Sequence, residues 1–302
     1  MKKGLRFNLR GMELIAPAVL VMLVFTVYPI IYLIIGSFRS GSLIAWSKAG
    51  GALSQIQWAD FKNYEYLLAN ADFGKIVGNT VLYVVMLVAG RIGCSLLLAW
   101  WLNSKINKRL SKTTQAIAFM PHVISLVSVS MVFMWLYNKD TGFFNSILTS
   151  LKLPACEFLD SEGTALISIV FVMLWKSLGY YTLLMLAAMQ SVPKEVYEAA
   201  ELDNAPAWRT FLRITIPCIS PTIFFTTITA TINSFNVFDV INLLTQGGPI
   251  NSTNTLVYYI YSMMFKFSKP GVGCAAGVIL LAIVGTLTIV YFRVMERRVH
   301  YQ

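Results

Sequence analysis

Four carboxylates gather in one short polar stretch of an otherwise apolar chain. Glu195, Glu198, Glu201 and Asp203 fall within residues 191–217, which are too polar to lie in lipid. Like charges three or four residues apart on a helix repel by roughly 0.2–0.5 kcal/mol, and an ordinary solvated face more often mixes both signs. In a chain of net charge +10, this acidic helix favours docking to a basic partner; the alternative is a plain solvated helix.

Other chemistry-bearing residues do not form recognisable sites. His122 and His300 lie far apart in sequence, and the four cysteines form no CxxC pair. The chain has no GxxxxGK stretch, so we do not expect it to hold ATP in the usual phosphate loop. It also lacks a long basic run interleaved with aromatic residues, which disfavours nucleic acid as a partner. We therefore predict no catalytic residue and no metal site.

The composition predicts an all-α membrane protein. Hydrophobic residues make up 57% of the chain and charged residues 13%, about half the share of a soluble domain. A run of about 20 apolar residues can cross a bilayer, and a helix satisfies its own backbone there. Six spans are predicted, over residues 14–36, 76–103, 113–138, 164–190, 218–238 and 271–292.

The distribution of basic residues predicts the orientation of these spans. Lys and Arg are denser in the N-terminal segment, in the 103–112 and 191–217 loops and in the C-terminal tail than in the loops between them. Such segments face the cytoplasm. The predicted organisation is a cytoplasmic segment 1–13, a transmembrane domain 14–293 with a cytoplasmic loop 191–217, and a cytoplasmic tail 294–302. The first apolar segment is too long for a cleavable signal peptide.

The loop 191–217 carries signals for two helices. Pro193 ends the fourth span or begins a new helix, and residues 194–203 are good helix formers. Asn204 readily adopts the left-handed conformation that closes a helix. Pro206 then allows a second short helix to begin. The loop therefore predicts a helix, a sharp turn and a helix.

Polar residues within spans are costly and point to function. The fifth span is rich in Thr and ends with Asn233, Phe235 and Asn236, whose amides and ring suit a hydroxyl-rich solute. We predict that these residues line a solute path and that Asp239 lies near its outer mouth. The alternative is hydrogen bonding between helices.

Three further features of the spans have two interpretations each. Arg91 and Lys176 lie deep in their spans, where each either faces a carboxylate, a carbonyl or water, or takes part in the path or in a subunit interface. Gly273 and Gly277 form a GxxxG step that favours close helix packing, within this chain or with another subunit.

Part of the loop resembles the EAA motif of ABC importer permeases. The matching residues are Glu198, Ala199, Ala200, Asp203, Ala205, Phe211, Ile214, Pro217 and Pro221; Asn204 stands where the family usually has Gly. The stretch Thr245–Pro249 and the residues Tyr258, Tyr259 and Tyr261 are similar to the first permease of the carbohydrate branch, of the maltose and glycerol-phosphate type.

This resemblance implies a type I importer fold and a non-catalytic role in sugar or oligosaccharide import. It implies a second, related permease in a heterodimer, two ATPase subunits that bind ATP and Mg, and an extracytoplasmic solute-binding protein, all at a bacterial or archaeal cytoplasmic membrane with its lipid. Residues 194–214 would couple the chain to the ATPase. The coupling residues implied are Glu195, Glu198, Ala199, Ala200, Asp203, Asn204, Ala205 and Arg209.

Alternative functions differ in solute or in class. One is a type I permease for a non-sugar solute, such as a glycerophosphodiester or an oligopeptide-like compound. A secondary transporter should show repeats and paired broken helices, and a membrane enzyme should show clustered Asp, Glu, His or Cys; neither pattern is evident. A scaffold would not need polar residues throughout the fifth span.

Overall fold

The computed structural model describes residues 9–50, 52–104 and 108–295, and helices dominate them, as predicted. Residues 1–8 of the predicted N-terminal segment, 105–107 of the predicted basic loop and 296–302 of the predicted tail lie outside the described residues. The chain forms two compact units. Unit 1 comprises residues 1–70 and 259–281, and unit 2 comprises residues 71–258 and 282–302.

Unit 1 begins with a long apolar helical run. Residues Leu14–Gly36 have a mean hydropathy of 2.7, and their large apolar side chains are mostly exposed, as suits a helix surrounded by lipid. Arg39 pairs with Trp58 in a two-residue antiparallel ribbon. The elements of this unit are α1 (Leu9–Met22), a π-helical turn (Leu23–Val27), α2 (Tyr28–Gly36), β1 (Arg39–Ser40), α3 (Leu43–Lys48), a 3-10 turn (Leu53–Gln55), β2 (Gln57–Trp58) and α4 (Lys62–Ala69).

The predicted GxxxG step packs within unit 1. A Cβ at Gly273 would clash with the side chain of Met264, and one at Gly277 would come within 2.9 Å of Leu33. Both glycines lie in α16 (Pro270–Met295), whose first half belongs to this unit. Packing within the chain, the first of the two interpretations, is therefore confirmed for these positions.

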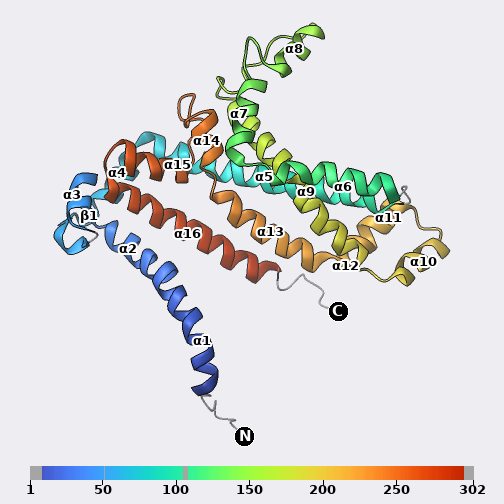
Figure 1. The fold of residues 1–302 in the computed structure, drawn as a ribbon, viewed down its shortest axis with the longest axis horizontal. Coiled ribbons are helices and arrows are strands. Elements are labelled where there is room, and N and C mark those ends of the chain that lie inside the picture. The colour runs from blue at the N-terminus through green and yellow to red at the C-terminus, as the bar shows by residue number, and fades with distance from the viewer. Residues whose placement is uncertain (1–8, 51, 105–107, 296–302) are drawn as a thin grey trace. The chain divides into compact units, whose positions relative to one another are not determined.

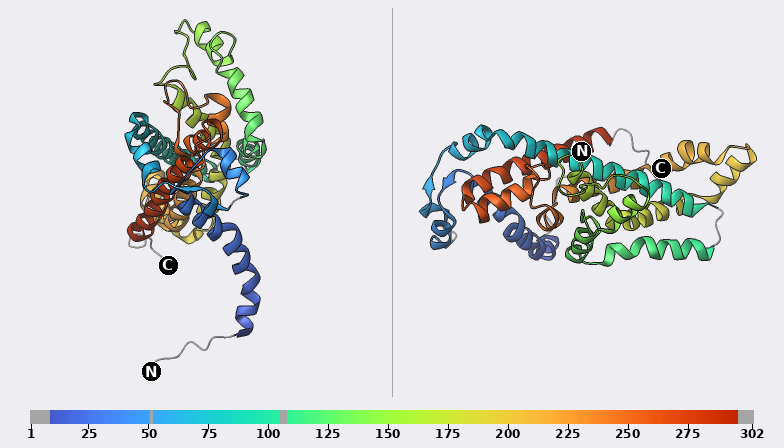
Figure 2. Two further views of the ribbon diagram at one scale, coloured as in Figure 1. Left: turned by 90° about the vertical axis from the view of Figure 1, so that its left-hand side faces the viewer. Right: turned by 90° about the horizontal axis from the view of Figure 1, so that it is seen from above.

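Unit 2 is built around α9 (Ala165–Gln190), which packs against α5 (Ala71–Asn103), α6 (Lys108–Val123) and α13 (Ser220–Phe235). Figures 1 and 2 show α5 and α6 lying along α9. The shorter elements are α7 (Leu126–Leu136), α8 (Phe143–Ser150), α10 (Lys194–Leu202), α11 (Ala207–Thr210), a π-helical turn (Phe211–Thr215), α12 (Ile216–Cys218) and α14 (Asp239–Leu244). The element α15 (Leu256–Tyr261), continued by a π-helical turn (Ser262–Lys266), passes from unit 2 to unit 1.

The described helices include four that are long and apolar enough to cross a membrane. Two further candidates are bent pairs: Leu110–Val123 with Leu126–Leu136 at 98°, and Ala207–Cys218 with Ser220–Phe235 at 72°. If each bent pair crosses the membrane as one span, these described helices provide six spans. The sequence did not predict either bend. Pro121 lies within the last turn of α6, where it removes a backbone donor before the first bend.

Candidate functional site

The loop between α9 and α13 forms the predicted helix, turn and helix. Pro193 is the N-cap of α10, which ends at Leu202. Asn204 has φ +47°, its N–H donates to the Glu201 carbonyl, and the Ala205 N–H donates to the Ala200 carbonyl, both at 3.0 Å. This pair of bonds is a Schellman cap, which needs a left-handed residue after the helix. Pro206 then precedes α11. Asn204 therefore performs the turn for which the related motif uses Gly.

The inner face of α10 is anchored to the helix bundle. Val196 and Tyr197 pack on the core formed at the ends of α5 and α9, and Ala200 is buried. The Tyr197 hydroxyl donates to the Met189 carbonyl at 3.4 Å. Farther along, Phe211 stacks on Trp100 with ring centroids 5.0 Å apart. Because the apolar side chains lie on one face, movement of α10 would be passed to α5, α9 and α13.

The outer face of α10 and the start of α11 are open to a partner. The exposed predicted coupling residues are Glu195, Glu198, Ala199, Asp203, Asn204 and Arg209, whereas Ala205 is half-buried. Leu202 is 84% exposed and Trp208 is 55% exposed. The sequence analysis did not single out these two apolar residues. Their positions were a usable signal, because Leu202 lies at the end of the acidic helix and Trp208 lies two residues after Pro206. The exposed surface of the loop thus includes acidic residues and two large apolar side chains.

A cavity of about 680 Å³ lies beneath this loop. Its walls come from the ends of α5 and α9 on one side and from α10 and α11 on the other, and include Trp100, Gln190, Tyr197 and Thr210. The loop therefore packs on the bundle around a cavity rather than through a continuous interface.

Arg91 is buried in unit 2 where α5, α9 and α13 meet. Its Nε donates to the Ser177 hydroxyl at 2.9 Å and its Nη1 to the Ser234 hydroxyl at 3.0 Å. The guanidinium also lies 5.3 Å from the ring centre of Tyr181. We expected a carboxylate, a carbonyl or water as the partner of Arg91, whereas both of its hydrogen-bond partners are serine hydroxyls.

Lys176 has a different environment at the bend between α6 and α7. Its ammonium donates to the carbonyls of Pro121, His122 and Ile124 at 3.3, 3.1 and 2.6 Å. Carbonyls at the end of a helix have no partner within it and favour a cation. The prediction of a carbonyl partner is confirmed for Lys176, which satisfies the carbonyls that the bend leaves free.

The predicted path residues divide between surface and interior. Asn233, Asn236 and Asp239 are exposed at the end of α13 and the start of α14. Phe235 is 2% exposed and is part of the interior. Most Thr hydroxyls of α13 donate to carbonyls of their own helix, such as Thr226 to Thr222. The structure therefore places three of the four residues together on the surface.

The stretch after α14 forms a compact loop held to α5. Asn79 donates to the carbonyls of Asn251 and Asn254 at 2.7 and 3.2 Å, and the Leu256 N–H donates to the Thr80 hydroxyl at 2.9 Å. Gly247 has φ +86° and lies against Tyr258, where a Cβ would come within 2.9 Å of the ring. This turn therefore requires Gly.

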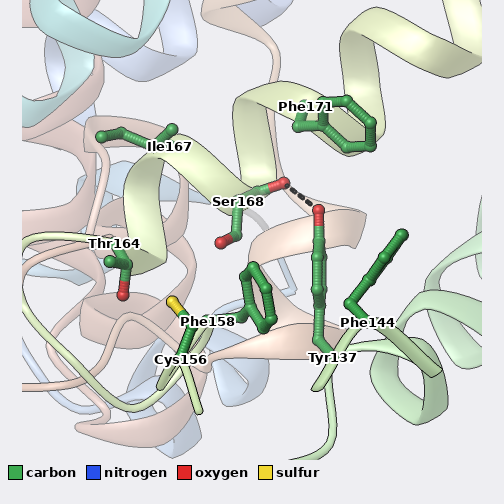
Figure 3. Close-up of a pocket in the computed structure, with 8 residues that line it drawn as sticks. All are labelled: Tyr137, Phe144, Cys156, Phe158, Thr164, Ile167, Ser168 and Phe171. Atoms are coloured by element: carbon green, nitrogen blue, oxygen red, sulfur yellow. Dashed lines mark hydrogen bonds between the residues drawn. The ribbon is translucent and has the colours of Figure 1, made fainter. Parts of the chain in front are cut away.

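An aromatic cavity of about 360 Å³ lies at the end of α9 opposite α10 (Figure 3). The rings of Tyr137 and Phe158 stack with centroids 4.9 Å apart, and the Tyr137 hydroxyl donates to the Ser168 carbonyl at 3.2 Å. Its lining is otherwise formed by Phe144, Cys156, Thr164, Ile167 and Phe171. The cavity suits an apolar group.

The described residues contain no group of three His, Cys, Asp or Glu side chains arranged to hold a metal ion. Their distinctive features are instead apolar helices, a capped acidic loop with a hollow beneath it, and a buried cation between helices. These features are typical of a helical membrane protein, the class to which transport subunits belong.

Comparison with known proteins gives the family. Residues 91–301 match the family described as the binding-protein-dependent transport system inner membrane component. The chain is 30% identical over 291 residues to the sulfoquinovosyl glycerol transport system permease protein SmoG of Agrobacterium fabrum, covering 96% of this chain and 92% of that protein. It is 32% identical over 298 residues to the lactose transport system permease protein LacF of Rhizobium radiobacter, covering 97% and 96%. The chain belongs to this family of ABC transporter permeases.

A solved structure shares the fold. It is that of a bacterial alginate ABC transporter in complex with an alginate pentasaccharide-bound periplasmic protein. The TM-score is 0.81 at 23% identity, over 97% of this chain and 96% of that chain. The predicted permease fold is thereby confirmed at the level of its helical architecture.

Proposed function

We propose that this chain is one permease subunit of an ATP-driven importer for a sugar or oligosaccharide. The carrying observation is the α10–α11 loop, whose inner face is anchored to the bundle and whose outer face presents Glu195, Glu198, Leu202 and Trp208. Relatives that share at least 30% identity over most of the chain are named as permeases for sulfoquinovosyl glycerol and lactose, which supports a carbohydrate solute.

The transporter would contain a second, related permease, two ATPase subunits that bind ATP and Mg, and a solute-binding protein outside the cytoplasmic membrane of a bacterium or archaeon. This chain would cross that membrane six times, with each bent pair as one span and both termini in the cytoplasm. The ATPase would bind α10, and its closure would move the loop and rock the helices between two states. Solute would pass Asn233, Asn236 and Asp239.

A glycerol-phosphate solute is the second candidate. The sn-glycerol-3-phosphate transport system permease protein UgpA of Pectobacterium atrosepticum is 30% identical over 247 residues, covering 82% of this chain. The two candidate solutes are distinguished by which of them stimulates ATP hydrolysis by the transporter.

The experiment is reconstitution of the chain with its second permease, ATPases and binding protein in nanodiscs. ATP hydrolysis is then measured with a panel of oligosaccharides and with glycerol 3-phosphate. We expect stimulation by a member of the oligosaccharide panel. Stimulation by glycerol 3-phosphate alone would replace sugar by the second candidate, and failure of the ATPase to associate would contradict the importer.

A further inference from the structure

Arg91 is a cation buried between three helices and held by two serine hydroxyls. It lies in the middle of α5, within the longest apolar helix of unit 2, and is 5% exposed. A buried cation in a membrane span is costly, and such residues mark function more often than packing. An apolar side chain of similar volume would fill the same space at lower cost.

The partners of Arg91 hold its position without neutralising its charge. The Ser177 hydroxyl donates to the Met173 carbonyl at 2.6 Å, and the Ser234 hydroxyl donates to the Ala230 carbonyl at 2.7 Å. Each serine therefore presents only its oxygen to Arg91, as a neutral acceptor. Among the residues that the structure describes, no carboxylate forms an ion pair with Arg91. Its two bonds use two of the five guanidinium N–H groups.

Lys176 shows what a structural cation looks like in the same unit. Its three ammonium donors meet three backbone carbonyls at a helix end, so the bend explains the charge. Arg91 meets no backbone carbonyl and lies at no helix end. A helix end therefore explains the charge of Lys176 but not that of Arg91, whose bonds join α5 to α9 and α13.

A chain of contacts connects Arg91 to the surface of α13. The guanidinium lies over the ring of Tyr181, and its partner Ser234 directly follows Asn233 in α13, whose side chain is exposed. Arg91 thus stands one side chain behind a residue of the proposed solute path. In a region of low dielectric constant, a fixed charge acts over such a distance with little screening.

We propose that Arg91 is a specificity-determining residue whose fixed positive charge, held behind Tyr181 and Asn233, selects an oligosaccharide carrying an acidic group such as a carboxylate. The inference rests on the proposed function, because it names the class of sugar that would pass. The charge attracts an anion and gives a neutral solute no comparable advantage.

The test uses the complete transporter in nanodiscs and a panel of oligosaccharides, each supplied as the uronic acid and as its carboxyl-reduced, neutral form. The variants are Arg91→Gln, which removes the charge, Arg91→Lys, which keeps it, and Lys176→Arg as a matched control that alters the other span cation. Solute-stimulated ATP hydrolysis and the half-saturating concentration of the loaded binding protein are measured for each.

We expect the wild type to be stimulated by an acidic member and at least roughly tenfold less by its neutral form. Arg91→Gln should erase this difference, while Arg91→Lys and the control retain it. Stimulation of the wild type by neutral members alone, or an equal effect of Arg91→Gln on both forms, would overturn the inference and leave sugar import intact. If Arg91→Gln fails to assemble, the absence of an acidic preference in the wild type still overturns the inference. Stimulation by no member would instead contradict sugar import itself.

Discussion

The α10–α11 loop and the Arg91 cluster are both charged regions of unit 2, and they treat charge in opposite ways. The loop exposes its acids as well as Leu202 and Trp208, and it packs on the helix bundle through Val196, Tyr197 and Phe211. The cluster buries one cation between three helices and holds it with neutral hydroxyls. A region that is bound from outside needs surface and freedom to move, whereas a region that selects a solute needs a fixed geometry. Substitutions in the loop should therefore cause a loss of coupling, whereas substitutions in the Arg91 cluster should cause a loss of packing or of selectivity.

The largest effect is expected where helices approach most closely in the interior. A Cβ at Gly179 would clash with the backbone carbonyl of Ala118, so Gly179→Ala must push α6 away from α9. We expect a loss of at least about 3 kcal/mol of stability, enough to prevent assembly. Thermal unfolding in nanodiscs measures it, with Gly93→Ala as control because nothing lies within 4 Å of that position. Equal stability of the two variants would refute the close packing.

Removing the cation at the bend should have the next largest effect. Lys176→Met leaves three carbonyls without their charged donor, and we expect a loss of about 2 kcal/mol. Lys176→Arg should restore part of it. The same unfolding measurement applies. An unchanged melting temperature for Lys176→Met would mean that water or lipid headgroups satisfy the bend.

The sequence predicted the structure of the loop better than it predicted the structure of the helix bundle around Arg91. The helical class and the loop geometry were predicted, because Pro193, Asn204 and Pro206 act locally through their own backbone preferences. The family followed from the residues around Glu198. The bends of 98° and 72° were not predicted. Pro121 marks the first one locally, but the Lys176 ammonium that satisfies the carbonyls at this bend comes from α9, far along the chain. Phe235 is buried for the same reason: tertiary packing, not residue type, decides which face of α13 is exposed.

An exposed aromatic side chain of the loop gives a smaller effect, on binding alone. Trp208→Ala should weaken association of the ATPase by about tenfold, because a large apolar residue at a docking centre contributes strongly to affinity. Stability should stay unchanged, since Trp208 is 55% exposed. Titration of the purified ATPase against the permease pair measures it. Trp101→Ala, 46% exposed in α5, is the control, and equal affinities would remove Trp208 from the docking face.

The smallest effect is expected for an ion pair outside both regions. Lys139 pairs with Glu157, and this hydrogen bond raises the pKa of Lys139 above its ordinary value of 10.5. At neutral pH the Lys139 ammonium is charged and the ion pair is formed. The pair is lost as the pH rises through the raised pKa of Lys139. Lys139→Gln should leave transport unchanged, because both side chains are exposed. Amide protection of residues 139–160, taken relative to the intrinsic exchange rate, should be lower in the variant than in the wild type at neutral pH; identical protection would contradict the pairing.

The central claim is that α10 transmits ATPase movement to the helices, and charge reversal at Glu198 tests it most directly. Glu198 is exposed on α10, so Glu198→Lys should fold and insert normally. Glu65→Lys makes the same charge change at an exposed position of α4 and serves as control. Binding-protein-dependent uptake is measured at matched expression. We predict that uptake is lost in Glu198→Lys and retained in the control, and normal uptake by Glu198→Lys would contradict the account.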